Sequence, residues 1–462
     1  MKAPVPGVVL RGSAPVLEER FEAARERLGL PGAFPPAVVD AARAAAAAGP
    51  RAAERRDLRD VPFVTVDPRG SRDLDQALHL ERRGDGFRIH YAIADVGAWV
   101  ARGDPLDAEA WLRGQTFYAP DRRTPLYPPE LSEGAASLLP DGDRPAVVLE
   151  LDLAGDGTRT AFRPYRALVR SRRQLAYDDV GPGDVPLLDV VGPLLADRAA
   201  ERGAIELDAP AQVVVPDGGP AGYRLEWEER RPSEGWNAQI SLAANAAVGE
   251  ELGRRGTGVL RTMPPPRPQA LRALHATARA LDIPWPHDRT LGALVSTLPQ
   301  GARRAAFVVA ARRALGGASY RVLQGAPTPE DAHAAVGGLY AHATAPLRRL
   351  ADRYLLDALV GDVVDAETFG RLAHVMELSD ALAARYEHAI VDLVESRLLE
   401  GREGEVFDAC VLSVGGSLRI QIAVPPIVAS LPEGHGLDPG DAVRVRLAHV
   451  DVEEGRLDFR PA

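Results

Sequence analysis

The fold is decided by the stretch Val61-Pro-Phe-Val-Thr-Val-Asp67-Pro-Arg-Gly-Ser-Arg-Asp73-Leu-Asp75-Gln76-Ala-Leu78. Residues 61 to 66 are rich in β-branched side chains, which predicts a buried strand. A Pro/Gly loop follows and carries Asp67, Asp73 and Asp75 before a second strand begins. Because like charges in one loop repel one another, we expect the loop to hold a hard divalent cation, for which Mg²⁺ is the natural candidate.

The spacing of these aspartates also fits an ordinary turn. Asp is common in turns because its side chain accepts hydrogen bonds from nearby backbone N–H groups. A calcium loop of the EF-hand type fits poorly, because the twelfth residue counted from Asp67 is Leu78, where such a loop needs a bidentate Glu. Spacing alone therefore leaves the metal site and the plain turn open.

Further motifs follow the aspartates and separate these two readings. They are Arg88-Ile-His-Tyr-Ala-Ile-Ala-Asp95, Arg113-Gly-Gln-Thr-Phe-Tyr118-Ala-Pro-Asp121, Leu126-Tyr-Pro-Pro-Glu-Leu-Ser132 and Ala136-Ser-Leu-Leu-Pro140. In their order and separations they resemble the catalytic (RNB) domain of the ribonuclease II family. The resemblance extends over residues 60 to 462 and implies an RNA-degrading enzyme.

Length and composition limit the class of protein. A chain of 462 residues is too long for one ordinary core, so two or three domains are expected. The net charge of −10 argues against a generic basic nucleic-acid binder, although local arginines and a bound metal can still favour RNA in a channel. Cys410 is the only cysteine, which excludes disulfides within the chain and a cysteine-based zinc site. With no long apolar run and no signal pattern, a cytoplasmic protein without a membrane partner is expected.

The chain divides into three predicted domains. Residues 1–55 form a small helical module with helices at 16–28 and 37–48, which we interpret as a packing appendage in preference to a helix-turn-helix. The catalytic domain, 56–400, has strands early and helices late, an α+β pattern. Residues 401–462 carry short strands separated by turns, the pattern of a small OB-fold β-barrel, and resemble the RNA-binding domain that closes many ribonuclease II relatives.

A second motif lies far along the chain, at Tyr340-Ala-His342-Ala-Thr344-Ala-Pro346-Leu-Arg348-Arg349-Leu-Ala-Asp352. Two adjacent arginines just past a proline, where a helix is predicted to begin, offer a compact set of donors for a phosphodiester. Arginine pairs are also common on ordinary protein surfaces. The stretch is similar to the family motif Tyr-x-His-Phe-Thr-Ser-Pro-Ile-Arg-Arg, which favours phosphate binding.

The resemblance implies a role for each matching residue. Asp67, Asp73 and Asp75 fall on metal-holding carboxylates, and Asp75 is the one that we expect to be least dispensable. Arg348, with Arg349 beside it, falls on the arginine that grips the scissile phosphate. The RNA-contacting positions are Tyr118, which matches a residue that stacks near the 3′ end, Tyr177, which matches a tyrosine near the sugar, and Glu387, which matches a late acidic residue at the 3′ end.

Three departures from the family pattern affect this prediction. Gln76 replaces the usual fourth aspartate, so it offers the metal an oxygen without a charge. Ala238 and Gln239 replace paired acidic residues, which bears on discrimination between ribose and deoxyribose. Ala343 and Ala345 stand where Phe and Ser are usual.

The sequence therefore predicts a hydrolytic, metal-dependent 3′-to-5′ exoribonuclease that degrades single-stranded RNA to nucleoside 5′-monophosphates. Mg²⁺ is the expected cofactor, with Mn²⁺ as a substitute, and a monomer is expected. Two alternatives remain open at this point. One is a catalytically weak or inactive RNB-family RNA-binding protein, suggested by Gln76, and the other is a metal-dependent enzyme that acts on DNA or another phosphodiester, suggested by Ala238 and Gln239.

Overall fold

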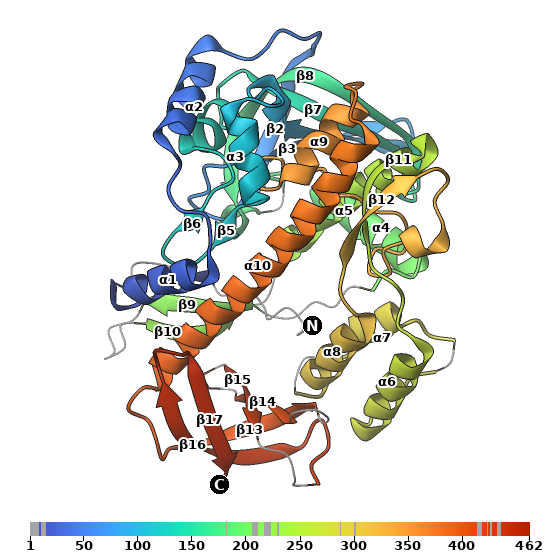
Figure 1. Ribbon diagram of the computed structural model, residues 1–462. Coiled ribbons are helices and arrows are strands. Elements are labelled where there is room, and N and C mark those ends of the chain that lie inside the picture. The colour runs from blue at the N-terminus through green and yellow to red at the C-terminus, as the bar shows by residue number, and fades with distance from the viewer. Residues whose placement is uncertain are drawn as a thin grey trace.

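The structure is a computed structural model (Figure 1), and it describes residues 9–10, 15–181, 183–205, 211–216, 223–228, 231–286, 288–299, 302–413, 418–422, 424–425, 427–431 and 436–462. Strands dominate the first part of the catalytic domain and helices the second, which confirms the predicted α+β class. None of the helices in these ranges is both long and apolar enough to cross a membrane.

A closed five-stranded barrel forms the core of the catalytic domain. Its strands are β2 (Arg56–Asp67), β3 (Gln76–Arg83), β4 (Gly86–Ala94), β7 (Arg144–Leu153) and β8 (Arg159–Ala176). Neighbours pair antiparallel except β2 and β8, which run parallel and close the barrel. The closure sets Asp67 opposite Ala176, so the end of β2 and the end of β8 lie side by side. Gly84 and Asp85 form the turn between β3 and β4.

Short elements lie between β4 and β7 beside the barrel. They are α3 (Pro105–Arg113), β5 (Phe117–Tyr118) and β6 (Arg123–Thr124). The helical part of the domain follows β8. Its elements are α4 (Leu188–Glu201), α5 (Pro232–Arg255), β11 (Thr257–Thr262), α6 (Pro268–Ala280), α7 (Leu291–Thr297), α8 (Ala302–Leu315), β12 (Ser319–Gln324), α9 (Leu350–Leu359) and α10 (Ala366–Leu399). A small separate sheet contains β1 (Val9–Leu10), β9 (Ala211–Pro216) and β10 (Tyr223–Glu228).

The C-terminal strands form one five-stranded antiparallel sheet, in the order β15-β14-β13-β16-β17. Their bounds are β13 (Val406–Ser413), β14 (Leu418–Ile422), β15 (Ile427–Leu431), β16 (Ala442–Asp451) and β17 (Arg456–Pro461). The edge strands β15 and β17 contact each other, which gives the nearly closed barrel of the predicted OB fold.

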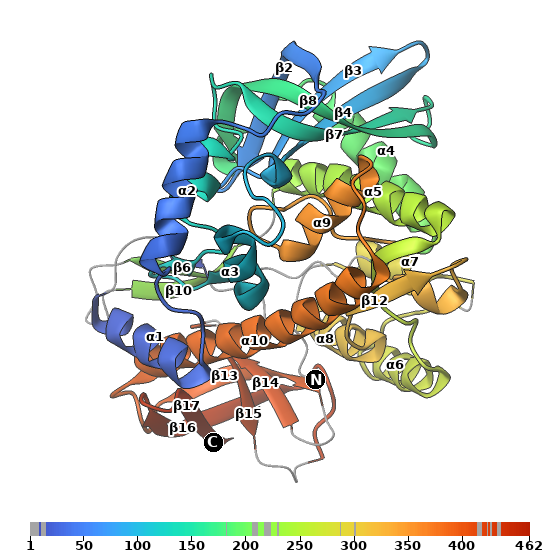
Figure 2. The ribbon, with the colours of Figure 1, turned by 45° about the horizontal axis from the view of Figure 1, so that its top comes forward.

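The two N-terminal helices are found where they were predicted, as α1 (Pro15–Leu28) and α2 (Pro36–Ala48). They join two different cores. Phe21 of α1 is fully buried in the core that also contains the C-terminal sheet, whereas Val38 and Ala42 of α2 are buried in the barrel core. The helix α10 runs between these two parts of the molecule, and α1 lies along it (Figure 2).

Candidate active site

The carboxylate loop joins β2 to β3, and a serine from a distant part of the chain fixes it. The Ser137 hydroxyl accepts a hydrogen bond from the Leu74 N–H (2.9 Å) and donates one to the Arg72 carbonyl (2.6 Å). Leu74 itself is fully buried. Because the backbone of the loop is held on both sides of Asp73, the aspartates cannot rearrange without breaking buried contacts.

Asp75 is the most enclosed of the three aspartates, with 4% of its surface exposed. One carboxylate oxygen accepts the Leu347 N–H at 2.7 Å, and the other accepts Nε of Arg348 at 3.1 Å. Burial raises the pKa of Asp75 to about 7, while Arg348 and the Leu347 N–H oppose this shift. The loop and the second motif, separated by more than half of the chain, therefore meet at this carboxylate.

Asp67 lies at the end of β2 and shares the same electrostatic environment. Burial raises its pKa to about 7, Arg348 opposes the shift and the charge of Asp73 adds to it. Its Oδ2 atom is buried and has no hydrogen-bond partner within the described parts of the chain. A buried carboxylate oxygen without a partner is costly to ionise unless a cation approaches it.

The other two expected metal ligands are engaged within the protein. Asp73 forms an ion pair with Arg123, which also pairs with Glu133 at 2.6 Å. The Gln76 amide donates to the Thr344 carbonyl (2.6 Å), and its oxygen accepts the Tyr91 hydroxyl (2.6 Å). Over the described ranges, no group of three or more His, Cys, Asp or Glu side chains is arranged to hold a metal ion. The full convergence expected from the loop sequence is therefore not present.

The residues nevertheless fit a magnesium ion. Asp67 and Asp75 supply hard oxygen ligands, both are desolvated, and the unpartnered Oδ2 of Asp67 is the kind of atom that a cation would satisfy. Asp73 is close enough for its charge to raise the pKa of both residues. These three carboxylates are accordingly the groups that would hold Mg²⁺.

The two adjacent arginines face different partners. The Arg348 side chain is 40% exposed, and Nε is its one nitrogen with a partner in the described residues. Arg349 donates from two nitrogens to the fully buried Asp352, at 2.9 and 2.8 Å. Asp352 also accepts the Ala345 N–H at 2.7 Å, so Arg349 and Asp352 close the loop that presents Arg348. Arg348 is therefore free to bind an anion, whereas Arg349 is used to hold the loop in place through Asp352.

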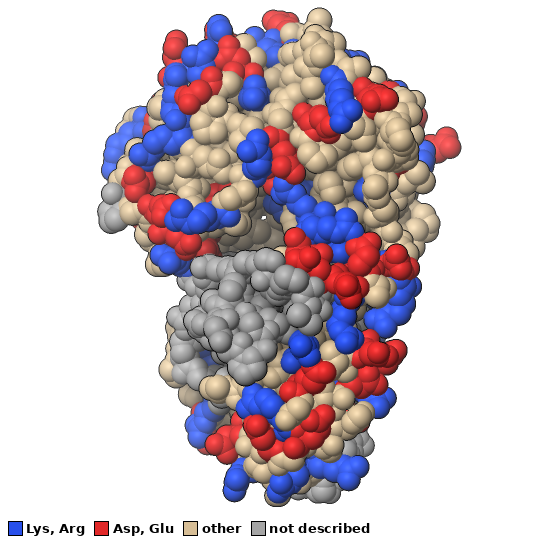
Figure 3. Space-filling model, turned by 90° about the vertical axis from the view of Figure 1, so that its left-hand side faces the viewer, with Lys and Arg blue, Asp and Glu red and all other residues tan. Residues whose placement is uncertain are grey.

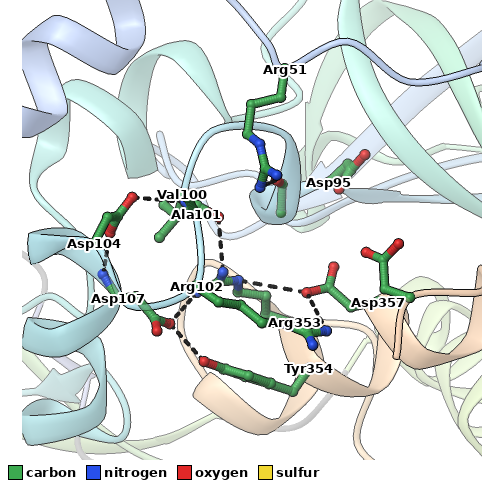
Figure 4. A network of polar contacts seen from close by, with 12 residues as sticks. Arg51, Asp95, Val100, Ala101, Arg102, Asp104, Asp107, Arg353, Tyr354 and Asp357 are labelled. Carbon is green, nitrogen blue, oxygen red and sulfur yellow. Dashed lines mark hydrogen bonds and ion pairs between the residues drawn. The ribbon is translucent and has the colours of Figure 1, made fainter. Parts of the chain in front are cut away.

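Helix α9 begins at Leu350, directly after the arginines, and a buried polar network anchors it (Figure 4). Arg353 donates to Asp107 of α3 at 2.6 Å and to the Val100 carbonyl at 2.8 Å. The Tyr354 hydroxyl donates to the same Asp107 oxygen at 2.8 Å. Nothing in the sequence pattern singled out Asp107 or Arg353, because an Arg–Asp pair far apart in the chain has no local signature.

Tyr118 is the aromatic side chain most open to solvent near the aspartates, with 47% of its surface exposed beside the buried Phe117. The charges of Arg348, Asp73 and Asp75 act on its phenol, so it lies at the same site. The backbone links it to Arg348, since the Thr116 N–H donates to the Arg348 carbonyl at 2.9 Å.

Two other predicted RNA contacts are placed differently. The Tyr177 hydroxyl accepts Nδ2 of Asn237 at 3.2 Å, and Asp67 lies close enough to act on its pKa, which burial raises. Glu387 lies on α10, where burial raises its pKa and nearby Asp380 adds to the shift. No contact within the described residues joins Glu387 to the carboxylate loop.

Helix α5, which carries Ala238 and Gln239, also supplies Asn245, to which the sequence alone assigned no role. Asn245 accepts the Ala343 N–H at 2.9 Å and donates to the Thr344 hydroxyl at 3.1 Å. Ala343 and Ala345 are fully buried, so the small side chains let this segment lie tightly against the helix.

On the face of the molecule in Figure 3, acidic and basic side chains are interspersed, and basic side chains border a hollow.

Comparison with known proteins gives two family matches. The RNB domain matches residues 55–182, and the RNase II-type exonuclease C-terminal S1 domain matches residues 405–462. Ribonuclease R of Aquifex aeolicus is 27% identical, over 88% of this chain and 64% of the relative, and that of Escherichia coli is 26% identical, over 88% and 57%. The chain thus spans about three fifths of the length of these relatives.

Solved structures show the same fold. Mycoplasma genitalium RNase R in complex with ribose-methylated single-stranded RNA superposes with a TM-score of 0.85 at 20% identity, over 97% of this chain and 78% of the other. Yeast Ssd1, described as a pseudonuclease, superposes with a TM-score of 0.73 at 14% identity, over 95% and 59%. The fold is therefore shared by a protein named as a ribonuclease and by one named as a pseudonuclease.

Proposed function

Since this chain carries an RNB domain and an RNase II-type S1 domain and so belongs to the ribonuclease II (RNB) family, we propose that it is a metal-dependent 3′-to-5′ exoribonuclease. It would hydrolyse single-stranded RNA and release nucleoside 5′-monophosphates. The observation that carries the proposal is the contact between Asp75 and Arg348, which sets a buried carboxylate beside a half-exposed guanidinium. This is the pairing of a metal ligand with a phosphate ligand that phosphodiester hydrolysis needs.

Each residue has a place in this mechanism. When bound by Asp67, Asp73 and Asp75, Mg²⁺ would acidify a water molecule and stabilise the leaving 3′-oxygen. Arg348 would bind the non-bridging phosphate oxygens with the two guanidinium nitrogens that Nε leaves free, and so neutralise charge as it develops. Tyr118 would stack on the terminal base, and Tyr177 would lie beside its sugar. We propose a contact of Glu387 with the 3′ end on the family resemblance alone.

The direct test is digestion of a 5′-labelled single-stranded RNA, with Mg²⁺ or Mn²⁺, followed by sizing of the products. A ladder that shortens from the 3′ end, together with nucleoside 5′-monophosphates by chromatography, is the expected result. A matched DNA oligonucleotide in the same assay measures the effect of Ala238 and Gln239 on sugar discrimination. Intact RNA under both metals would refute the proposal.

A second candidate, an RNA-binding relative without catalysis, is favoured by one observation. Gln76 replaces a charged residue, and both ends of its amide are already bonded to Tyr91 and Thr344. RNA that is shifted on a native gel but not shortened with either metal would support this candidate. The same pair of assays therefore separates the two functions.

Metal binding can be measured without activity. We expect Mg²⁺ to raise the melting temperature of metal-free protein, because a ligand that binds only the folded state at 100 times its Kd stabilises that state by about 2.7 kcal/mol. Asp67→Asn should remove most of this shift, whereas Asp85→Asn, at the exposed turn between β3 and β4, should retain it. Equal shifts in both variants would mean that Mg²⁺ binds elsewhere.

Tyr118→Ala is expected to weaken binding of short single-stranded RNA by about 1–3 kcal/mol, the usual contribution of one base–aromatic stack. Tyr118→Trp should retain the affinity because it keeps an aromatic face. Fluorescence anisotropy with a labelled oligonucleotide, in the Asp75→Asn background to prevent cleavage, gives the Kd values. An unchanged Kd in Tyr118→Ala would show that the terminal base does not rest on this side chain.

A further inference from the structure

A cavity of about 930 Å³ lies beside helix α5. Its walls come from the β7–β8 hairpin, α4, α5 and the segment that leads into the second motif. The volume is in the range of about 300–1,000 Å³ that is usual for small-molecule sites. None of the three loop aspartates, Tyr118 or Arg348 lines it, although Gln239 of α5 and Tyr340 and His342 of the second motif do, so the cavity adjoins the site described above without including the aspartates.

One wall of this cavity is apolar. Helix α5 contributes Leu242, Ala243 and Ala246 from one face, and Leu153 and Leu195 lie among the residues of the other walls. A surface of this kind suits the flat faces of a base or a ribose, which bury carbon-rich area. Tyr340 and His333 add two aromatic rings whose centroids are 5.4 Å apart.

His333 brings an unsatisfied polar group to the cavity. Its side chain lines the cavity, is 8% exposed, and has an Nδ1 atom without a hydrogen-bond partner in the described residues. Burial lowers the pKa of His333 to about 4, with Arg261 adding to the shift, so the ring is neutral at pH 7. A neutral imidazole can donate or accept one hydrogen bond, as the edge of a base requires.

Arginines make up much of the polar lining of the cavity. Arg159 forms an ion pair with Glu250, and Arg198 pairs with Asp156 at 3.6 Å and with Glu201. Arg202 has no ion-pair partner among the described residues. Burial lowers the pKa of Arg202, Glu250 opposes the shift, and the two neighbouring arginines add to it. Over the whole lining there are five arginines and two glutamates, so the cavity carries a net positive charge that an anion would compensate.

The position of the cavity links it to the reaction. Helix α5 turns Asn237 and Asn245 toward Tyr177 and the second motif, and its adjacent face forms the cavity wall. The second motif joins the two places, because its Thr344 carbonyl accepts the Gln76 amide beside the aspartates and its Tyr340 and His342 line the cavity. The lining combines an apolar wall, two aromatic rings and a surplus arginine, which together match a nucleoside phosphate.

We propose that this cavity binds a free nucleoside 5′-monophosphate, with the phosphate on Arg202 and the base at the Tyr340 and His333 end. The inference rests on the proposed function, because it assigns to the cavity the product of that reaction. It gives the protein a holding site for its own product, and added product should then slow the degradation of RNA.

The test uses the full chain and isothermal titration with AMP, UMP and inorganic phosphate in separate experiments. We expect both nucleotides to bind more tightly than phosphate, and Arg202→Gln to weaken AMP binding about 10-fold, the usual loss for a charge-assisted hydrogen bond. Ala246→Phe should also weaken it, because the ring fills the cavity beside α5. Arg254→Gln is the matched control, since Arg254 lies exposed on the same helix and does not line the cavity.

A second readout follows the rate of RNA shortening in the presence of added AMP. Arg202→Gln should start at the wild-type rate and need about 10-fold more AMP for the same inhibition. The inference is overturned if AMP does not bind, if it binds equally to wild type, Arg202→Gln and Ala246→Phe, or if phosphate alone binds as tightly. Displacement of AMP by single-stranded RNA in wild type but not in Arg202→Gln would assign the cavity to the strand and also overturn it.

These outcomes are separate from those of the proposed function. Isothermal titration does not require RNA cleavage. If the protein leaves RNA intact but binds AMP in a way that depends on Arg202, the proposed exoribonuclease activity is refuted and the proposed nucleotide site is supported. If Ala246→Phe fails to fold, as judged by its melting curve, Arg202→Gln still decides the result.

Discussion

Asp75→Asn is expected to lower the rate of RNA shortening by about 10²- to 10³-fold, the usual loss when one preorganised charge-stabilising group is removed from an active site. Asparagine has nearly the same shape, so its oxygen can still accept the Leu347 N–H. It cannot hold a cation by charge, and it no longer pairs electrostatically with Arg348. Replacing one carboxylate oxygen by an amide nitrogen thus weakens both groups proposed to act on the scissile phosphate, the bound cation and Arg348.

The measurement compares single-turnover rates on a 5′-labelled RNA with those of wild type and Asp85→Asn. Asp85 is exposed at the β3–β4 turn, so its variant changes the net charge by the same amount away from the site. In metal-free buffer, melting curves and RNA affinity should stay close to wild type in both. A wild-type rate in Asp75→Asn would remove the carboxylate loop from the mechanism.

Arg349→Ala should mainly lower stability and Arg348→Ala should mainly lower the cleavage rate, although the two residues are adjacent. Arg349→Ala leaves the buried Asp352 without its bidentate partner, and breaking such a pair costs about 3–5 kcal/mol of unfolding free energy. Arg348→Ala should have little effect on stability, because its side chain is 40% exposed, but should reduce the cleavage rate about 10²-fold or more.

Urea unfolding gives the first quantity and single-turnover cleavage gives the second. Lysine substitutions at the same positions serve as controls, since they keep the charge but not the bidentate geometry. If Arg349→Ala were stable and inactive while Arg348→Ala were unstable, the assignment of the two side chains would be reversed.

Local patterns predicted much of this fold. The helices at 16–28 and 37–48 and the carboxylate loop between two strands depend on periodicity and turn residues that act over a few positions. The contact between Asp75 and Arg348 was implied by the family resemblance alone. No spacing rule joins residues that are so far apart in the chain.

What the sequence did not reveal depends on tertiary contacts. The parallel pairing of β2 with β8 closes the barrel, and nothing local specifies it. The ion pair between Asp73 and Arg123 was not predicted either, because Asp73 lies in the carboxylate loop and Arg123 lies on β6, 50 positions further along the chain. Helix α10 runs unbroken for 34 residues, and the contacts along its length that support it come from distant parts of the chain that no local pattern reveals.

The length of helix α10 also sets a distance within the molecule. At 1.5 Å per residue, its 34 residues are about 51 Å long, and it contacts β11 and β12 on one side and β16 and β17 on the other. The spacing between the C-terminal sheet and the aspartates is therefore set by a count of residues. Inserting seven residues, close to two full turns, would lengthen this spacer by about 10 Å with little rotation. Under the proposed function, with RNA bound first by the C-terminal sheet, the length of RNA protected between that sheet and the aspartates would then grow by the same step.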